Sequence, residues 1–109
     1  LVGFDNIYFN PLNISTLCSL IEKVFIKNLK PGVYNLGSRG VINKYKLMKM
    51  FVEKFSSKKI LPLKTNYKQK KNKAKRPLNM LMNSSKFERY TKIKLPNISH
   101  EIRKSILEF

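Results

Sequence analysis

Three stretches of the chain carry apolar residues at helical spacing, and they limit the fold more than any other feature of the sequence. The first has apolar residues three and four positions apart: Ile14, Leu17, Leu20, Ile21, Val24 and Phe25. Asn13 precedes it as a predicted N-cap, and the Pro31-Gly32 pair follows as a stop signal. We therefore expect an amphipathic helix that begins directly after Asn13.

The other two stretches predict further helices. One should run from about Lys44 to Phe55 with Asn43 as its N-cap. Its expected buried face consists of Leu47, Met48, Phe51, Val52 and Phe55. The last follows Pro96 and places four apolar side chains on one stripe: Ile98, Ile102, Ile106 and Phe109.

Short segments between these helices have the composition of strands. Four are expected: residues 1–9, 33–36, 58–65 and 78–82. Pro62 confines the third to a sheet edge or a strand end. Ser84 or Ser85 can cap a short helix that reaches Tyr90. At 109 residues the chain is long enough for one domain with a modest core, so we expect an α+β domain of three or four helices with short strands.

The charge of the chain is strongly basic. Twenty-three basic residues against six acidic ones give a net charge of +17. Seven of the cations lie between Lys64 and Arg76 in a stretch without acidic residues or apolar periodicity, which predicts a loop. Such a balance favours a polyanionic partner, either nucleic acid or phosphate groups. The alternative is a generally lysine-rich surface, which the scarcity of arginine favours. The six acidic residues are scattered and are expected to be solvated surface charges.

The residues offer little for catalysis. Cys18 and His100 are the single cysteine and histidine, so the sequence predicts no disulfide, no metal site and no nucleophile–base pair. There is no glycine-rich cofactor motif, no secretory signal and no apolar run of roughly 18–20 residues that could span a membrane. Three Tyr-x-x-x-Lys pairs occur, which is somewhat above chance: Tyr45/Lys49, Tyr67/Lys71 and Tyr90/Lys94.

The "GSRG" segment, Gly37 to Gly40, has the spacing of the loop by which KH domains clamp a nucleic-acid backbone. A KH loop joins two helices, whereas the residues before this one are strand-like. The segment is therefore interpreted as a strand-to-helix turn that needs a positive φ.

Four segments share a set of motifs when they are taken in order: "DNIYFNPLNISTLCSLI", "GVYNLGSRGVINKYKLMKMFVEKF", "ILPLKT" and "AKRPLNMLMNSSKFERYTKIKLPNISHEIRKSI". Together they resemble the C-terminal portion of extended short-chain dehydrogenases/reductases that act on nucleotide sugars, most closely dTDP-4-dehydrorhamnose reductases. Leu12 stands where that group has threonine, and "STL" replaces its Asp-Leu-Ala. A sister reductase or epimerase of the same superfamily fits about as well.

The resemblance implies that residues 1–109 are a substrate-binding lobe. The N-terminal Rossmann half, with the NAD(P)H site and the catalytic residues, would be missing from this chain. The lobe alone would then have no catalytic or cofactor-binding residue, and it would be inactive. The implied partners are a nucleotide sugar and the Rossmann half, in the cytoplasm and without a membrane; homo-oligomerisation is left open.

In such enzymes a segment that leads into Arg-Pro lies near the substrate diphosphate. By this resemblance Arg76 would bind the diphosphate bidentately, with Lys75 and Lys73 as auxiliary charges. The outer lysines, Lys68 to Lys71, would form a solvated loop. Three alternatives stay open: Arg76 pairs with a carboxylate of the Rossmann half, the chain is a small basic nucleic-acid-binding module, or it is a scaffold that has lost the chemistry.

Overall fold

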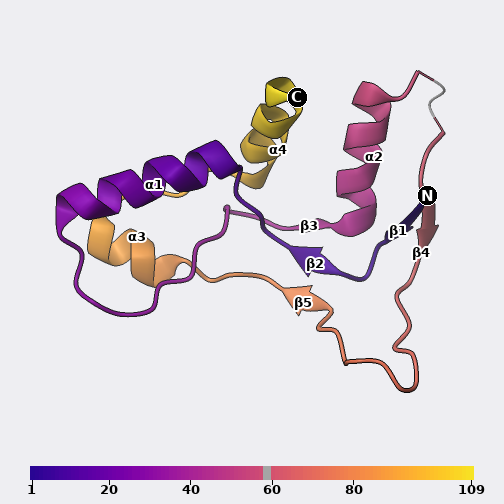
Figure 1. Cartoon of the computed structure of the whole chain (residues 1–109), viewed down its shortest axis with the longest axis horizontal. Coiled ribbons are helices and arrows are strands. Elements are labelled where there is room, and N and C mark those ends of the chain that lie inside the picture. The colour runs from indigo at the N-terminus through magenta and orange to yellow at the C-terminus, as the bar shows by residue number, and fades with distance from the viewer. Residues whose placement is uncertain (58–59) are drawn as a thin grey trace. The chain divides into compact units, whose positions relative to one another are not determined.

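A computed structural model describes residues 1–57 and 60–109, and the chain divides into two compact units (Figure 1). Unit 1 consists of Leu1–Phe9 and Val41–Leu81, and unit 2 consists of Asn10–Gly40 and Met82–Phe109. The described residues form four helices and several short strands, which confirms the α+β class.

Unit 1 contains a parallel strand pair covered by a helix. Strand β1 (Val2–Phe4) pairs with β4 (Leu63–Thr65), and helix α2 (Lys44–Phe55) packs against both. The contact is close, because a Cβ on Gly3 would lie 2.8 Å from the Cα of Tyr45. Glycine is therefore required where the helix crosses β1.

The second sheet of unit 1 has three strands in the order β3 (Ile42–Asn43), β2 (Tyr8–Phe9), β5 (Asn79–Met80). Strand β2 is antiparallel to β3 and parallel to β5. The single strand expected over residues 1–9 is thus wrong in one respect: a bend after Phe4 divides it between two sheets.

Helix α2 has the predicted bounds and the predicted cap. The Asn43 side chain accepts a hydrogen bond from the backbone N–H of Lys46 at 2.8 Å. Its expected buried face is only half-buried, and Phe55 is 51% exposed. A two-stranded sheet is too narrow to cover a helix of this length. Of the strand expected over 58–65, Lys58 and Lys59 lie outside the described residues, and β4 begins directly after Pro62.

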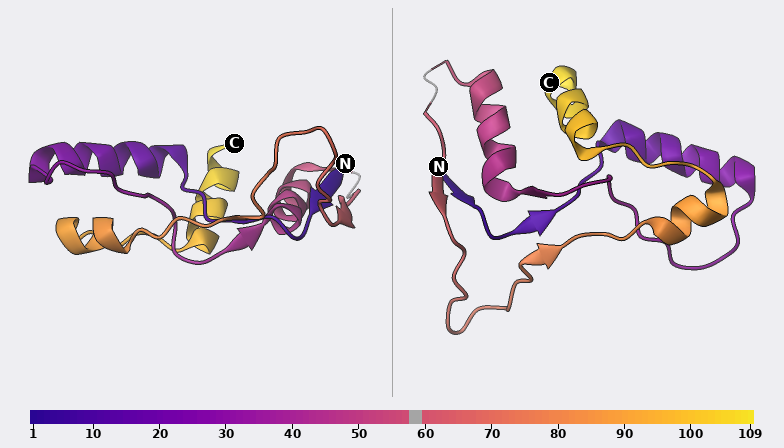
Figure 2. Two further views of the ribbon diagram at one scale, coloured as in Figure 1. Left: turned by 90° about the horizontal axis from the view of Figure 1, so that it is seen from below. Right: turned by 180° about the vertical axis from the view of Figure 1, so that it is seen from behind.

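Unit 2 contains helices α1 (Ile14–Lys27), α3 (Ser85–Thr91) and α4 (Ile98–Glu108). Helices α1 and α3 lie side by side in both Figure 1 and Figure 2. The buried cluster of unit 2 consists of Leu20, Phe87 and Leu95, with Leu12, Val24, Tyr34, Leu36 and Ile93 packed against it.

The strand expected over residues 33–36 is wrong. These residues form no strand, Val33 is 82% exposed, and Tyr34 and Leu36 pack against the core cluster instead. In the described part of unit 2 only an isolated bridge between Arg39 and Asn97 has strand-like pairing. An extended segment without a neighbouring strand cannot enter a sheet.

The helix caps follow the prediction in α1 and depart from it in α3. Asn13 accepts from the backbone N–H of Ser15 at 2.8 Å. Ser84 occupies the N-cap position of α3, but its hydroxyl accepts the N–H of Gly37 at 2.9 Å and makes no cap hydrogen bond. Asn83 takes that role by accepting from the N–H of Ser85 at 3.0 Å.

The apolar stripes of α1 and α4 are only partly covered. In α4, Ile98 and Ile102 are buried, whereas Phe109 beyond the helix is 90% exposed. In α1 the exposed apolar side chains include Ile14, Ile21 and Phe25. Helical spacing therefore located both helices, but it overestimated how much of each apolar face is buried.

The Gly37–Gly40 segment is a turn between extended segments. Gly40 has φ +101°, as the turn interpretation requires, and a Cβ on Gly37 would lie 2.6 Å from Nδ2 of Asn10. The nearest helices in the chain end at Lys27 and begin at Lys44. The segment therefore lacks the two flanking helices of a KH loop.

Candidate functional site

Residues 66–78 connect β4 to β5 and are called the basic loop. The side-chain amide of Gln69 forms hydrogen bonds with backbone groups of this loop. Its Nε2 donates to the carbonyls of Lys73 and Ala74, both at 3.2 Å, and its Oε1 accepts the N–H of Arg76 at 3.2 Å. Asn72 has φ +65° and lies in the turn that these hydrogen bonds close. The loop is therefore a folded hairpin-like turn with exposed lysines.

The start of the basic loop is fixed to the segment after β1. The side chain of Asn6 donates to the carbonyl of Tyr67 at 3.0 Å and accepts the Tyr67 N–H at 2.7 Å. The ring of Tyr67 meets the ring of Phe4 edge to face, with centroids 5.4 Å apart. These contacts set the position of Tyr67 beside the cations of the loop.

The basic loop, together with Phe4 of β1 and Thr65 of β4, lines a hollow of about 790 Å³, called the basic pocket. Its lining consists of Phe4, Thr65, Asn66, Tyr67, Lys68, Lys70, Lys73, Ala74 and Arg76. Four of these side chains are cationic, and no described carboxylate lines the pocket. Asp5 follows the lining residue Phe4 in the sequence, but its carboxylate forms an ion pair with Lys64 at 3.2 Å. The pocket therefore has the electrostatics of an anion site.

The structure brings together two of the three residues predicted to bind a diphosphate. Arg76 and Lys73 both line the basic pocket, whereas Lys75 does not. Lys68 and Lys70, which the sequence placed in a solvated outer loop, line the pocket with them. Tyr67 and Phe4 add an aromatic wall that charge alone did not predict.

The pocket has cations to bind oxygen anions but no pair of groups suited to acid–base catalysis. Of the three Tyr-x-x-x-Lys pairs, only Tyr45/Lys49 lies within one helix, and Lys49 is 3.8 Å from Glu53. Across residues 1–57 and 60–109, no group of three or more His, Cys, Asp or Glu side chains could hold a metal ion. The basic pocket therefore offers cationic and aromatic side chains that could contact a ligand.

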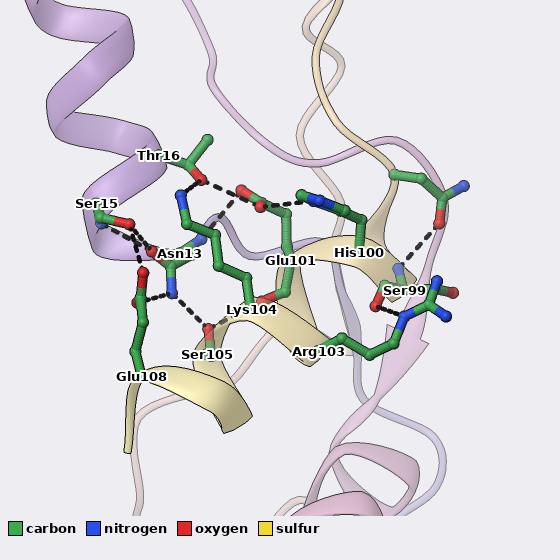
Figure 3. A network of polar contacts seen from close by, with 11 residues as sticks. Asn13, Ser15, Thr16, Ser99, His100, Glu101, Arg103, Lys104, Ser105 and Glu108 are labelled. Atoms are coloured by element: carbon green, nitrogen blue, oxygen red, sulfur yellow. Dashed lines mark hydrogen bonds and ion pairs between the residues drawn. The ribbon is translucent and has the colours of Figure 1, made fainter.

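A second polar group of residues joins α1 to α4 and is called the α1–α4 cluster (Figure 3). Its members are Asn13, Ser15, Thr16, His100, Glu101, Lys104, Ser105 and Glu108. Glu101 is only 2% exposed. Its Oε1 accepts the backbone N–H of Asn13 at 3.3 Å and its Oε2 accepts the hydroxyl of Thr16 at 3.1 Å.

The expectation that every acidic residue is a solvated surface charge is therefore wrong for Glu101. Its partners, the N-cap residue Asn13 and Thr16 of α1, lie 88 and 85 positions away in the chain, so no local pattern could have indicated its burial. The carboxylate satisfies donors at the N-terminal end of α1, where negative charge is favourable. His100 lies 3.6 Å from Glu101, but it is largely exposed and the carboxylate is already engaged by α1. The cluster therefore acts as a cap that joins two helices.

Glu108 gives the α1–α4 cluster a pH dependence. The side chains of Asn13 and then Ser15 donate to its carboxylate at 2.7 and 2.9 Å, and they hold its pKa below the ordinary value of 4.5. A carboxyl group whose pKa is lower in the folded state stabilises the fold above its unfolded pKa, and this contribution is lost as the pH falls through the folded value.

We therefore expect the Glu108→Gln variant to have a lower Tm than the unsubstituted chain at neutral pH, with the difference closing below pH 4.5. Thermal unfolding followed by circular dichroism across this range measures the two curves. Glu22→Gln, on the exposed side of α1, is the control and should show no such convergence. A Tm difference that stayed constant with pH would contradict the assignment.

Comparisons with models of known protein families and with curated protein sequences found no match to this chain. None of the helices in the described residues has both the length and the hydrophobicity needed to cross a membrane.

Proposed function

We propose that this chain is the nucleotide-sugar-binding lobe of an NAD(P)-dependent reductase that acts on a 4-keto-deoxysugar, similar to dTDP-4-dehydrorhamnose reductase. The observation that supports the proposal is the basic pocket, which gathers Arg76 and Lys73 beside an aromatic wall. These cations lie just before Pro77, where the motif resemblance expects diphosphate contacts. A Rossmann domain of the same protein would supply the cofactor and the proton donor, and the location would be the cytoplasm.

Arg76 is the proposed anchor of the diphosphate. A guanidinium group is planar and can donate to two phosphate oxygens at once, whereas a lysine acts as a point charge. The Arg76 backbone is fixed by Gln69, and Pro77 restricts the chain on the other side. The side chain therefore starts from a constrained backbone, which reduces the entropy lost on binding.

Replacing Arg76 with alanine is expected to weaken the binding of dTDP-rhamnose by about 10- to 100-fold, because hydrogen bonds to charged groups contribute about 1.5–3 kcal/mol. The affinity of Arg76→Lys should lie between those of the unsubstituted chain and Arg76→Ala, since lysine keeps the charge but loses the paired donors. Isothermal titration calorimetry at about 0.15 M salt measures the dissociation constants.

The matched control is Arg103→Ala, which removes the same charge from an exposed position on α4. It should leave the dissociation constant within about twofold, because Arg103 does not line the basic pocket. Equal losses of affinity for dTDP-rhamnose in the Arg76 and Arg103 variants would mean that net charge, and not a contact of Arg76, causes the effect. Absence of binding by the unsubstituted chain would overturn the proposal.

A small nucleic-acid-binding module is the second candidate, and Tyr67 beside four lysine and arginine side chains favours it. Binding of a single-stranded oligonucleotide would then weaken steeply as salt increases, because each neutralised phosphate releases a counterion. Tyr67→Ala should weaken such binding, since a base stacked on an aromatic ring contributes about 1–3 kcal/mol. Competition between the oligonucleotide and dTDP-rhamnose would show which ligand the basic pocket prefers.

A further inference from the structure

We infer that the basic pocket binds a chain of three phosphates more tightly than it binds the diphosphate of a nucleotide sugar. A nucleoside triphosphate or inorganic tripolyphosphate would then compete with the nucleotide sugar and regulate the lobe. The competition rests on the proposed function, whereas the preference for three phosphates rests on the pocket alone.

The charge of the pocket exceeds that of a diphosphate. Lys68, Lys70, Lys73 and Arg76 line it, and none of the described lining residues is acidic. A diphosphate esterified at both ends carries about one negative charge on each phosphate, which leaves about two of the four cations uncompensated. A triphosphate with a free end carries about four negative charges, because a terminal phosphate loses its second proton near pH 6. The triphosphate therefore matches the cations of the pocket.

The arrangement of the cations suits a linear anion. Lys68 and Lys70 lie on the limb of the basic loop that leaves β4, and Lys73 and Arg76 lie on the limb that returns toward β5. Gln69 joins the two limbs through its hydrogen bonds to the Lys73 carbonyl and the Arg76 N–H, so their separation is set before a ligand arrives. Such preorganisation lowers the cost of bringing four like charges around one ligand.

The size and the wall of the pocket fit a nucleotide as well as a bare phosphate chain. Its volume of about 790 Å³ lies within the usual range for small-molecule sites. Tyr67 and Phe4 form an apolar side next to the cations, against which a base could pack. The two sources of a triphosphate therefore share the cation site and differ only in contact with this aromatic wall.

The test is calorimetric titration of the whole chain at about 0.15 M salt with tripolyphosphate, pyrophosphate, dTTP and dTDP-rhamnose in turn. Tripolyphosphate is expected to bind at least about tenfold more tightly than dTDP-rhamnose and to displace it, with pyrophosphate between them. If dTTP binds more tightly than tripolyphosphate, the aromatic wall contributes and a nucleotide is the ligand. Equal affinities for dTTP and tripolyphosphate would mean that the phosphate chain alone is sufficient for binding.

The charge-matched comparison uses two double variants. Lys68→Gln/Lys70→Gln should lose most of the preference for three phosphates, whereas Lys23→Gln/Lys94→Gln, at exposed positions in unit 2, should keep it. Equal affinity for tripolyphosphate and dTDP-rhamnose, or equal losses in both double variants, would overturn the inference. Tight binding of tripolyphosphate without any binding of dTDP-rhamnose would support the inference while the proposed function fails. Binding of dTDP-rhamnose that depends on Arg76, without a preference for three phosphates, would support the proposed function while the inference fails.

Discussion

Replacing Phe87 with alanine is expected to destabilise unit 2 by about 3–5 kcal/mol. Phe87 is 1% exposed and belongs to the buried cluster with Leu20 and Leu95. Its ring also meets Tyr34 edge to face, with centroids 6.5 Å apart. Removal of the ring exposes this cluster and leaves a cavity that short helices and loops can fill only in part. Urea unfolding followed by circular dichroism measures the change.

Phe25→Ala is the matched control, because it removes the same ring from a position that is 83% exposed. Its effect should stay within about 0.5 kcal/mol. If the alanine variant of Phe87 does not fold, Phe87→Leu provides a milder change of about 1–1.5 kcal/mol that can still be measured. Equal losses for Phe87 and Phe25 would contradict the assignment of the core.

The helices were predictable because their signals are local. Each end of α2 is set by residues that are close to that end in the sequence. At the start, the side chain of Asn43 accepts a hydrogen bond from a backbone N–H only three positions away. The same holds for Asn13 at the start of α1. Residues 33–36 show the limit of such signals, since a strand exists only where another strand pairs with it. Nothing local distinguishes a paired extended segment from one that packs its alternate side chains on a helical core.

The basic pocket was predictable in charge but not in geometry. The density of cations up to Arg76 indicated an anion site, and the structure assembles four of them around one hollow. The residues that shape the loop carry no charge. Gln69 acts through backbone groups across the turn, and Asn6 holds Tyr67 from 61 positions away. Amides are common in loops of every kind, so their role appears only when the fold brings their partners within hydrogen-bond distance.

Glu101 carries the second large expected effect: Glu101→Ala should destabilise unit 2 by about 2–3 kcal/mol. Its carboxylate accepts the buried N–H of Asn13 and the hydroxyl of Thr16. Without these oxygens both donors lose their partners, and a buried donor left unsatisfied costs about 1–3 kcal/mol. Urea unfolding measures the loss, with Glu22→Ala on the exposed side of α1 as the control.

Conservative variants separate this capping role from the loss of packing. Glu101→Gln keeps one oxygen for the Asn13 N–H but presents an amide donor to Thr16, which already accepts from Lys104 at 3.0 Å. It should therefore destabilise unit 2 less than Glu101→Ala. A double-mutant cycle of Glu101→Ala and Thr16→Val should show a coupling energy of about 0.5 kcal/mol or more, because the two residues share one hydrogen bond. A coupling energy near zero would mean that the hydrogen bond between Thr16 and Glu101 adds nothing to the stability of unit 2.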